Sequence, residues 1–164
     1  MQFTESFIFS GNGWALMGAI DALISLKLFT NMENNENYQK LLENFQHHAG
    51  NLSLLQDSDK GLWHNILDDP DSFMETSASA MFMYAYLKGV EHNFLDASIY
   101  EQIICKTWQG LKERIDFDGT ISGIIGETGI KDTAEDYGPQ NTKYSHSSPG
   151  LGSVLRAVAA IVNS

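Results

Sequence analysis

The residues best suited to contact a ligand follow a short glycine-bearing run near the start of the chain. Gly11, Asn12 and Gly13 precede Trp14. An indole has a flat apolar face that stacks on a pyranose ring and an N–H that donates to a hydroxyl group, and the glycines keep the backbone beside it open. Trp14 and Asn12 are therefore candidate binding residues. The alternative for Trp14 is a core position at the start of a helix.

Three further stretches carry side chains with useful chemistry. Trp63 and His64 lie in a loop, where His64 can bond a ligand or orient a neighbour, or the pair can simply pack the loop. Thr76 and Ser77 open a helix after Glu75, and Thr76 is a candidate binding residue that can face the pocket. The alternative is structural, with Thr76 as a cap and Glu75 beside the positive end of the helix dipole. His146, just before the last expected helix, is the remaining candidate binding residue.

The acidic and histidine-bearing stretches do not predict a metal site. Asp68, Asp69 and Asp71 are interrupted by a proline and lack the spacing of a calcium loop. His47 and His48 are adjacent on an expected outer helix, without a matched ligand four residues on. The chain also has no nucleophile-elbow or phosphate-loop motif. We therefore predict no metal.

The elements that must position these side chains are helices. Apolar residues recur with a period near 3.6 in five segments, at residues 14–28, 38–52, 75–87, 103–115 and 152–162. Loops are expected at 57–73 and 116–148. Within the second, residues 120–125 resemble a short strand, but their glycines favour a loop. We expect an all-α protein with residues 1–164 in one domain.

A faint repeat connects these helices. The turn at Asp57–Trp63 is echoed at Asp116–Ile121, about 60 residues later, and each is followed by a loop and a helix that starts with small residues, at Ser77–Ala80 and Pro149–Gly152. A repeated unit of this kind predicts stacked helical hairpins. Small residues on alternate helices allow close packing, as expected for the inner ring of a helical toroid.

Composition excludes several classes of partner. The chain has 164 residues, of which 43% are hydrophobic, and a formal net charge of −11. Nucleic-acid phosphates and anionic membrane surfaces both require clustered cations, so neither is an expected partner. No stretch approaches the roughly 18 apolar residues of a membrane span. The single cysteine, Cys105, excludes an internal disulfide, and its apolar run predicts burial.

Several linked motifs resemble glycoside hydrolase families 88 and 105. They are Gly11–Met17, Gly61–Ser72 and Glu75–Phe82, with a weaker match at Arg114–Gly123. The resemblance implies a partial (α/α)6 toroid, since the family barrel has twelve helices and this chain supplies about five of them, from the C-terminal part. It also implies that Trp14 lines a sugar pocket.

The same resemblance implies an unusual reaction. The family hydrates the C4=C5 bond of an unsaturated galacturonyl or glucuronyl residue left by a polysaccharide lyase, as in pectin degradation, with an aspartate as general acid and base. No cofactor is implied. The expected partner is an unsaturated oligosaccharide. Disaccharide processing, together with a start that lacks a leader pattern, favours the cytoplasm.

Two departures from the family pattern leave the catalytic residue unknown. Ser10 stands where the related proteins usually have arginine, whose guanidinium would suit a substrate carboxylate. The family's catalytic aspartate lies before the Gly11–Trp14 motif, where only Glu5 is acidic. The alternative function is therefore a non-catalytic remnant that binds carbohydrate or a protein partner. Because an arc of helices has two open apolar edges, we also expect self-association or a missing N-terminal half.

Overall fold

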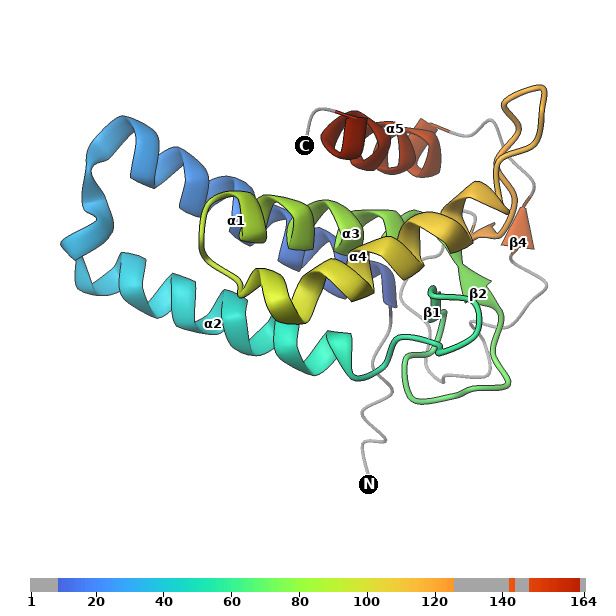
Figure 1. The fold of residues 1–164 in the computed structure, drawn as a ribbon, viewed down its shortest axis with the longest axis horizontal. Helices are drawn as coiled ribbons and strands as arrows, with labels where there is room; N and C mark the ends of the chain where they lie inside the picture. The colour runs from blue at the N-terminus through green and yellow to red at the C-terminus, as the bar shows by residue number, and fades with distance from the viewer. Residues whose placement is uncertain (1–8, 126–141, 144–147, 163–164) are drawn as a thin grey trace.

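The structure, a computed structural model, describes residues 9–125, 142–143 and 148–162 (Figure 1). The helices are α1 (Phe9–Thr30), η1 (Met32–Asn34), α2 (Glu36–Ser53), α3 (Thr76–Glu91), α4 (Ala97–Lys112) and α5 (Ser148–Val162), and the strands are β1 (Trp63–His64), β2 (Met74–Glu75), β3 (Ile124–Ile125) and β4 (Thr142–Lys143). The five helical segments predicted from the apolar period are confirmed.

The helices form two layers of an incomplete ring. α1, α3 and α5 start at the same end of the molecule and run in the same direction, whereas α2 and α4 return antiparallel to them (Figure 1). α3 packs against α1 and α5, while α2 packs on α1 and α4 on α3. The arrangement is a partial (α/α)6 toroid with three inner helices, α1, α3 and α5, and two outer helices.

Small residues let the inner helices approach one another. α3 is buried along most of its length and begins with the small residues Thr76, Ser77 and Ala78. A Cβ added to Gly13 of α1 would lie 2.8 Å from the Ala78 Cβ, closer than real Cβ contacts. The predicted role of small residues in inner-helix packing is thus visible where α1 meets α3.

The outer helices are capped and amphipathic. The Asn35 side chain accepts a hydrogen bond from the backbone N–H of Asn37 at the start of α2, and Asp96 does the same for Ser98 at the start of α4. Each then buries one face and exposes the other, as expected for an outer layer. The buried faces comprise Tyr38, Phe45, Ala49 and Leu52 of α2 and Tyr100, Ile104, Thr107, Gly110 and Leu111 of α4.

Two sequence expectations need correction. Residues 124–125 form strand β3 rather than loop, because they pair with residues 142–143, too far along the chain for a hairpin pattern to reveal. Cys105 is exposed rather than buried, because it lies on the outer side of α4. None of the described helices is both long and apolar enough to cross a membrane.

Candidate functional site

The face of the arc turned away from the outer helices, here called the inner face, is identified by two tyrosines of α3. The ring of Tyr86 packs on Tyr100 of α4, with centroids 5.1 Å apart. Two residues along a helix correspond to nearly opposite directions, so Tyr84 points away from α4. Its hydroxyl donates to Asp21 of α1 at 2.8 Å and accepts from Arg156 of α5 at 3.0 Å.

Trp14 lies on this inner face. It precedes Gly18 by four residues and Asp21 by seven, so all three share one side of α1. The indole is 54% exposed in a helix that otherwise buries most of its bulky side chains. It is also in the first half of α1, at the end of the molecule where α3 and α5 begin (Figure 1). The position suits contact with a ligand that enters from that end.

Asn12 points elsewhere. Its Oδ1 lies 2.9 Å from Nε2 of His48 on the outer helix α2. His48 is half-buried, and this burial lowers its pKa from 6.5, which favours a neutral ring whose Nε2–H donates to Asn12. The structure therefore gives this Asn12 contact an inter-helix role, although the sequence suggested ligand binding.

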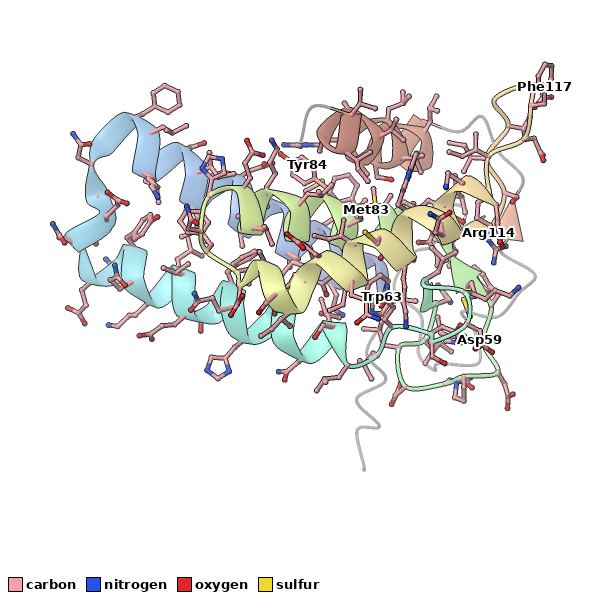
Figure 2. All side chains as sticks on the ribbon, viewed as in Figure 1. Asp59, Trp63, Met83, Tyr84, Arg114 and Phe117 are labelled. Carbon is pink, nitrogen blue, oxygen red and sulfur yellow. The ribbon has the colours of Figure 1, made fainter. Side chains whose placement is uncertain are left out.

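Trp63 lies in the hydrophobic core. Its side chain has no exposed surface. The indole Nε1–H donates to the Leu52 carbonyl oxygen at 2.7 Å, and the ring meets Phe82 edge-on with centroids 5.2 Å apart. Figure 2 shows the side chain among the helices. The sequence left ligand contact and loop packing open for Trp63, and in the structure its N–H and its ring are both engaged within the protein.

His64 packs the loop that follows β1. Its Nδ1 lies 2.6 Å from the Ser72 carbonyl oxygen, and its Nε2 lies 3.7 Å from Oδ2 of Asp57. An Nδ1–H that donates to Ser72 leaves Nε2 facing the Asp57 carboxylate. This arrangement corresponds to the loop-packing alternative rather than to a ligand contact.

Thr76 is also buried and bonded within the protein. Its Oγ1 donates to the Ser122 carbonyl oxygen at 2.7 Å, and its backbone N–H donates to the Gly123 carbonyl oxygen at 2.8 Å. The expected capping role of Thr76 is wrong, because Glu75 is the N-cap of α3. Through these two hydrogen bonds, Thr76 instead holds residues 122–123, which lead into β3, against the start of α3.

Glu75 is the polar centre of this junction. The buried carboxylate accepts hydrogen bonds from the Ala78 backbone N–H at 2.8 Å, the Ser77 hydroxyl at 2.6 Å and the Ile125 backbone N–H at 3.1 Å. Burial raises the pKa of Glu75 from 4.5, and the three hydrogen bonds oppose that rise. The structural role expected for Glu75 agrees with these contacts.

His146 and the side chain of Ser10 lie outside the described residues.

Sequence reasoning missed the polar group at the centre of the inner face. Arg156 donates to Asp21 and to Tyr84, and its guanidinium lies 4.4 Å from the Tyr84 ring centroid. Burial and the hydrogen bond to Asp21 raise the pKa of Tyr84. The sequence did contain a signal for this ion pair, because Asp21 is the sole acidic residue of α1 and Arg156 is the sole charged residue of α5.

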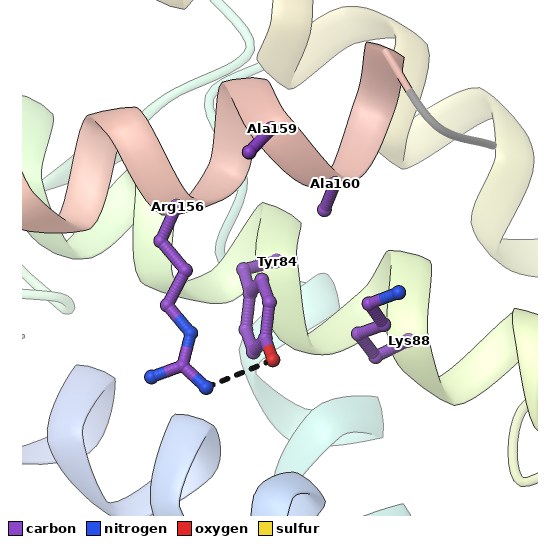
Figure 3. A pocket seen from close by; sticks show the side chains of 5 residues that line it. All are labelled: Tyr84, Lys88, Arg156, Ala159 and Ala160. Carbon is purple, nitrogen blue, oxygen red and sulfur yellow. Dashed lines mark hydrogen bonds between the residues drawn. The ribbon is translucent and has the colours of Figure 1, made fainter.

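A hollow of about 270 Å³ lies beside this group. Its lining residues are Tyr84, Lys88, Arg156, Ala159 and Ala160 (Figure 3). Both cations are already paired, Arg156 with Asp21 and Lys88 with Glu91. The described part of the chain contains no group of three or more His, Cys, Asp or Glu side chains placed to hold a metal ion. The hollow therefore offers a paired polar wall rather than acid–base or metal chemistry.

Comparisons with known proteins place this geometry in context. The model of Glycosyl Hydrolase Family 88 matches residues 10–163. The unsaturated rhamnogalacturonyl hydrolase YesR of Bacillus subtilis is 29% identical over 126 residues, which cover 77% of this chain and 33% of that protein. A 24.9 kDa protein in the picA locus of Rhizobium radiobacter is 27% identical over 166 residues, which cover 90% of this chain and 68% of that protein.

Solved structures agree with this relationship. A possible member of the GH105 family from Salmonella enterica superposes with a TM-score of 0.88 at 27% identity, over 98% of this chain and 41% of that one. A glycosyl hydrolase family 88 protein from Bacteroides vulgatus gives 0.79 at 28% identity, over 97% and 44%. The chain therefore spans less than half the length of the hydrolase relative and of both structures.

Proposed function

This chain belongs to glycosyl hydrolase family 88, and from that premise we propose that it forms the C-terminal, sugar-contacting part of a barrel that degrades unsaturated uronide oligosaccharides. The reaction adds water across the C4=C5 bond of an unsaturated galacturonyl or glucuronyl residue, with a proton delivered to C4 and a hydroxyl to C5. The hydrated product rearranges and releases the adjoining sugar. The cytoplasmic location remains a prediction.

The observation that carries this proposal is the exposed indole of Trp14 on the inner face. An aromatic ring of this size is usually buried in a folded protein, and Trp63 in this chain shows that burial. Trp14 is 54% exposed beside a backbone opened by Gly11, which has no heavy atom within 4 Å of an added Cβ. Stacking on the apolar face of a sugar ring would cover this indole.

No described residue is placed to act as the catalytic acid. Asp21 is the acidic group that shares the inner face with Trp14, and its carboxylate is held by Tyr84 and Arg156. Its Oδ1 accepts from the Tyr84 hydroxyl and its Oδ2 from Arg156, so both oxygens are already engaged within the protein. Hydration by this barrel therefore requires an acid from outside the described residues, which supports the alternative that the chain alone binds sugar without turning it over.

Tryptophan fluorescence tests the binding role. Unsaturated digalacturonic acid is titrated into the wild type, Trp14→Phe and the control Trp108→Phe, whose indole lies on the outer helix α4. A saturable change in the wild type and Trp108→Phe, lost in Trp14→Phe, is expected. An equal change in Trp14→Phe would remove this residue from the site.

The absorbance of the unsaturated enol ether separates the two functions. Loss of this absorbance on incubation with the folded chain indicates hydrolysis. A fluorescence response without loss of absorbance indicates the non-catalytic alternative. Neither signal in a folded sample would contradict both functions.

A further inference from the structure

The hollow of about 270 Å³ between α3 and α5 has a lining whose charge is opposite to that of the chain as a whole. Two of its five lining residues are the cations Lys88 and Arg156, and none of the described lining residues is acidic. The chain itself carries a formal net charge of −11. Figure 3 shows the two cations on either side of Tyr84. A concave surface lined by charges of one sign attracts a ligand of the other sign.

The acidic partners of these cations lie outside the hollow. Arg156 pairs with Asp21 of α1, and Lys88 pairs with Glu91 at the end of α3. Neither acid belongs to the described lining. A ligand in the hollow therefore meets the two cations directly, with the carboxylates of Asp21 and Glu91 behind them.

Both cations retain N–H groups that a ligand can use. The hydrogen bonds that Arg156 makes within the described residues all use Nη2, which donates to Asp21 and to the Tyr84 hydroxyl. The Lys88 ammonium donates to Glu91. Because a guanidinium has five N–H donors and an ammonium has three, further donors remain on each side chain. They suit a carboxylate, whose oxygens only accept hydrogen bonds.

The guanidinium is held in position before any ligand binds. It lies 4.4 Å from the ring centroid of Tyr84, whose hydroxyl donates to Asp21 at 2.8 Å. A side chain fixed in this way loses little conformational entropy when it contacts a ligand, which favours binding. The bridge of Asp21, Tyr84 and Arg156 thus prepares one side of the hollow.

The hollow is larger than a single ion requires. A water molecule takes roughly 30 Å³ in the liquid, so about 270 Å³ admits a group of several heavy atoms. The small residues Ala159 and Ala160 leave this space open on the α5 side. Because α3 and α5 are packed neighbours in the inner layer, further helices beside α1 or α5 would leave both walls in place.

We propose that this hollow binds the carboxylate of a sugar acid, with Arg156 and Lys88 as its two cationic contacts. The identity of the ligand as a sugar acid rests on the proposed function, whereas the anion site rests on the hollow itself. Asp21, which marks the level of Arg156, lies seven residues and therefore about 10 Å beyond Trp14 along α1. A short oligosaccharide stacked on Trp14 can extend to this second contact, so the two cations favour uronides over neutral sugars.

Nitrogen-15 NMR tests the site directly, because the chain has two arginines and the other, Arg114, follows the outer helix α4. The two Nε–H signals are assigned with Arg114→Lys and Arg156→Lys. Sodium galacturonate is expected to shift the Arg156 signal saturably and to leave the Arg114 signal in place. The methyl ester of galacturonic acid has the same ring without the charge, and it is expected to shift neither signal.

Lys88→Met tests the second cation and leaves the bridge of Arg156 with Asp21 intact. Loss of a hydrogen bond to a charged group is expected to weaken galacturonate binding about tenfold. Lys40→Met is the matched control, because Lys40 also forms a 2.5 Å ion pair with a glutamate of its own helix but lies on the outer helix α2. It is expected to bind galacturonate as the wild type does. The backbone amide spectrum reports whether each variant remains folded.

Three results would overturn the proposal. These are an Arg156 signal that does not respond to galacturonate, an equal response to the methyl ester, and wild-type affinity in Lys88→Met. Sodium phosphate separates a sugar-acid site from a general anion site, and a response to phosphate as tight as that to galacturonate would also contradict the proposal.

Failure of the proposed function is distinguishable from failure of this site. Trp14→Phe leaves the hollow intact, so the Arg156 response to galacturonate is expected to persist in that variant. A retained Arg156 response without any Trp14 fluorescence change rejects only the stacking role of Trp14. A Trp14 response to unsaturated digalacturonic acid with a silent Arg156 signal rejects only the carboxylate site.

Discussion

Arg156 of α5 donates a hydrogen bond to Asp21 of α1 across Tyr84 of α3, linking residues 135 positions apart. Contacts between α1 and α5 are otherwise sparse, because α3 separates them. This bridge therefore connects the first and last helices of the arc directly. It lies on the inner face that also bears Trp14.

We expect Arg156→Met to lower the free energy of unfolding by about 1 kcal/mol, because it removes a partly exposed ion pair together with the arginine–tyrosine contact. Lys40→Met is the matched control. Its ion pair with Glu36 has the same 2.5 Å separation as that of Arg156 with Asp21, but lies within one exposed helix. Urea denaturation is expected to show a loss of less than ~0.5 kcal/mol for the control. Equal losses would mean that the bridge has no special role.

Two glycines of α1 are expected to respond oppositely to alanine. Gly13→Ala would place a Cβ 2.8 Å from both the Ala78 Cβ and the Met81 Sδ, and this overpacking is expected to cost about 1–3 kcal/mol. Gly18→Ala meets nothing within 4 Å and is expected to gain up to about 1 kcal/mol from helix propensity. Thermal unfolding measures both. A stabilised Gly13→Ala would contradict the close α1–α3 packing.

Glu75→Gln is expected to change how stability depends on pH. Because burial raises the pKa of Glu75 above 4.5 in the folded state, folding is favoured by its protonation below that value, and this contribution is lost as pH rises through the folded-state pKa. The stability of the wild type relative to Glu75→Gln should therefore fall as pH increases above 4.5. Urea denaturation across this range measures the difference, and a constant difference would show that the carboxyl has the same pKa in both states.

The opposite direction is expected for His48. Its pKa lies below 6.5 in the folded state because the ring is half-buried. The neutral ring therefore contributes stability above pH 6.5 that is lost as pH falls through the folded-state pKa. His48→Gln should remove this dependence, whereas His47→Gln, at the exposed neighbouring position, should retain it. The same denaturation experiment distinguishes the two variants, and identical profiles would rule out the contribution of His48.

Residue pattern alone identified the helices and the family. The apolar period located five helices, and the motif that ends in Trp14 pointed to the exposed indole. These features are local, because a helix and its capping groups are formed by neighbouring residues. The same reasoning did not identify Trp63 and Thr76 as buried, since whether a side chain is buried depends on what packs over it.

By itself, the sequence determined which five segments form helices, that they stack as hairpins, and which family they belong to. Tertiary structure alone decided that the Trp63 indole N–H donates to the Leu52 carbonyl oxygen and the Thr76 hydroxyl to that of Ser122. It also decided that Arg156 pairs with Asp21. The physical reason is distance along the chain: these partners come together only when separate segments pack, and helical periodicity carries no information about which segments those are.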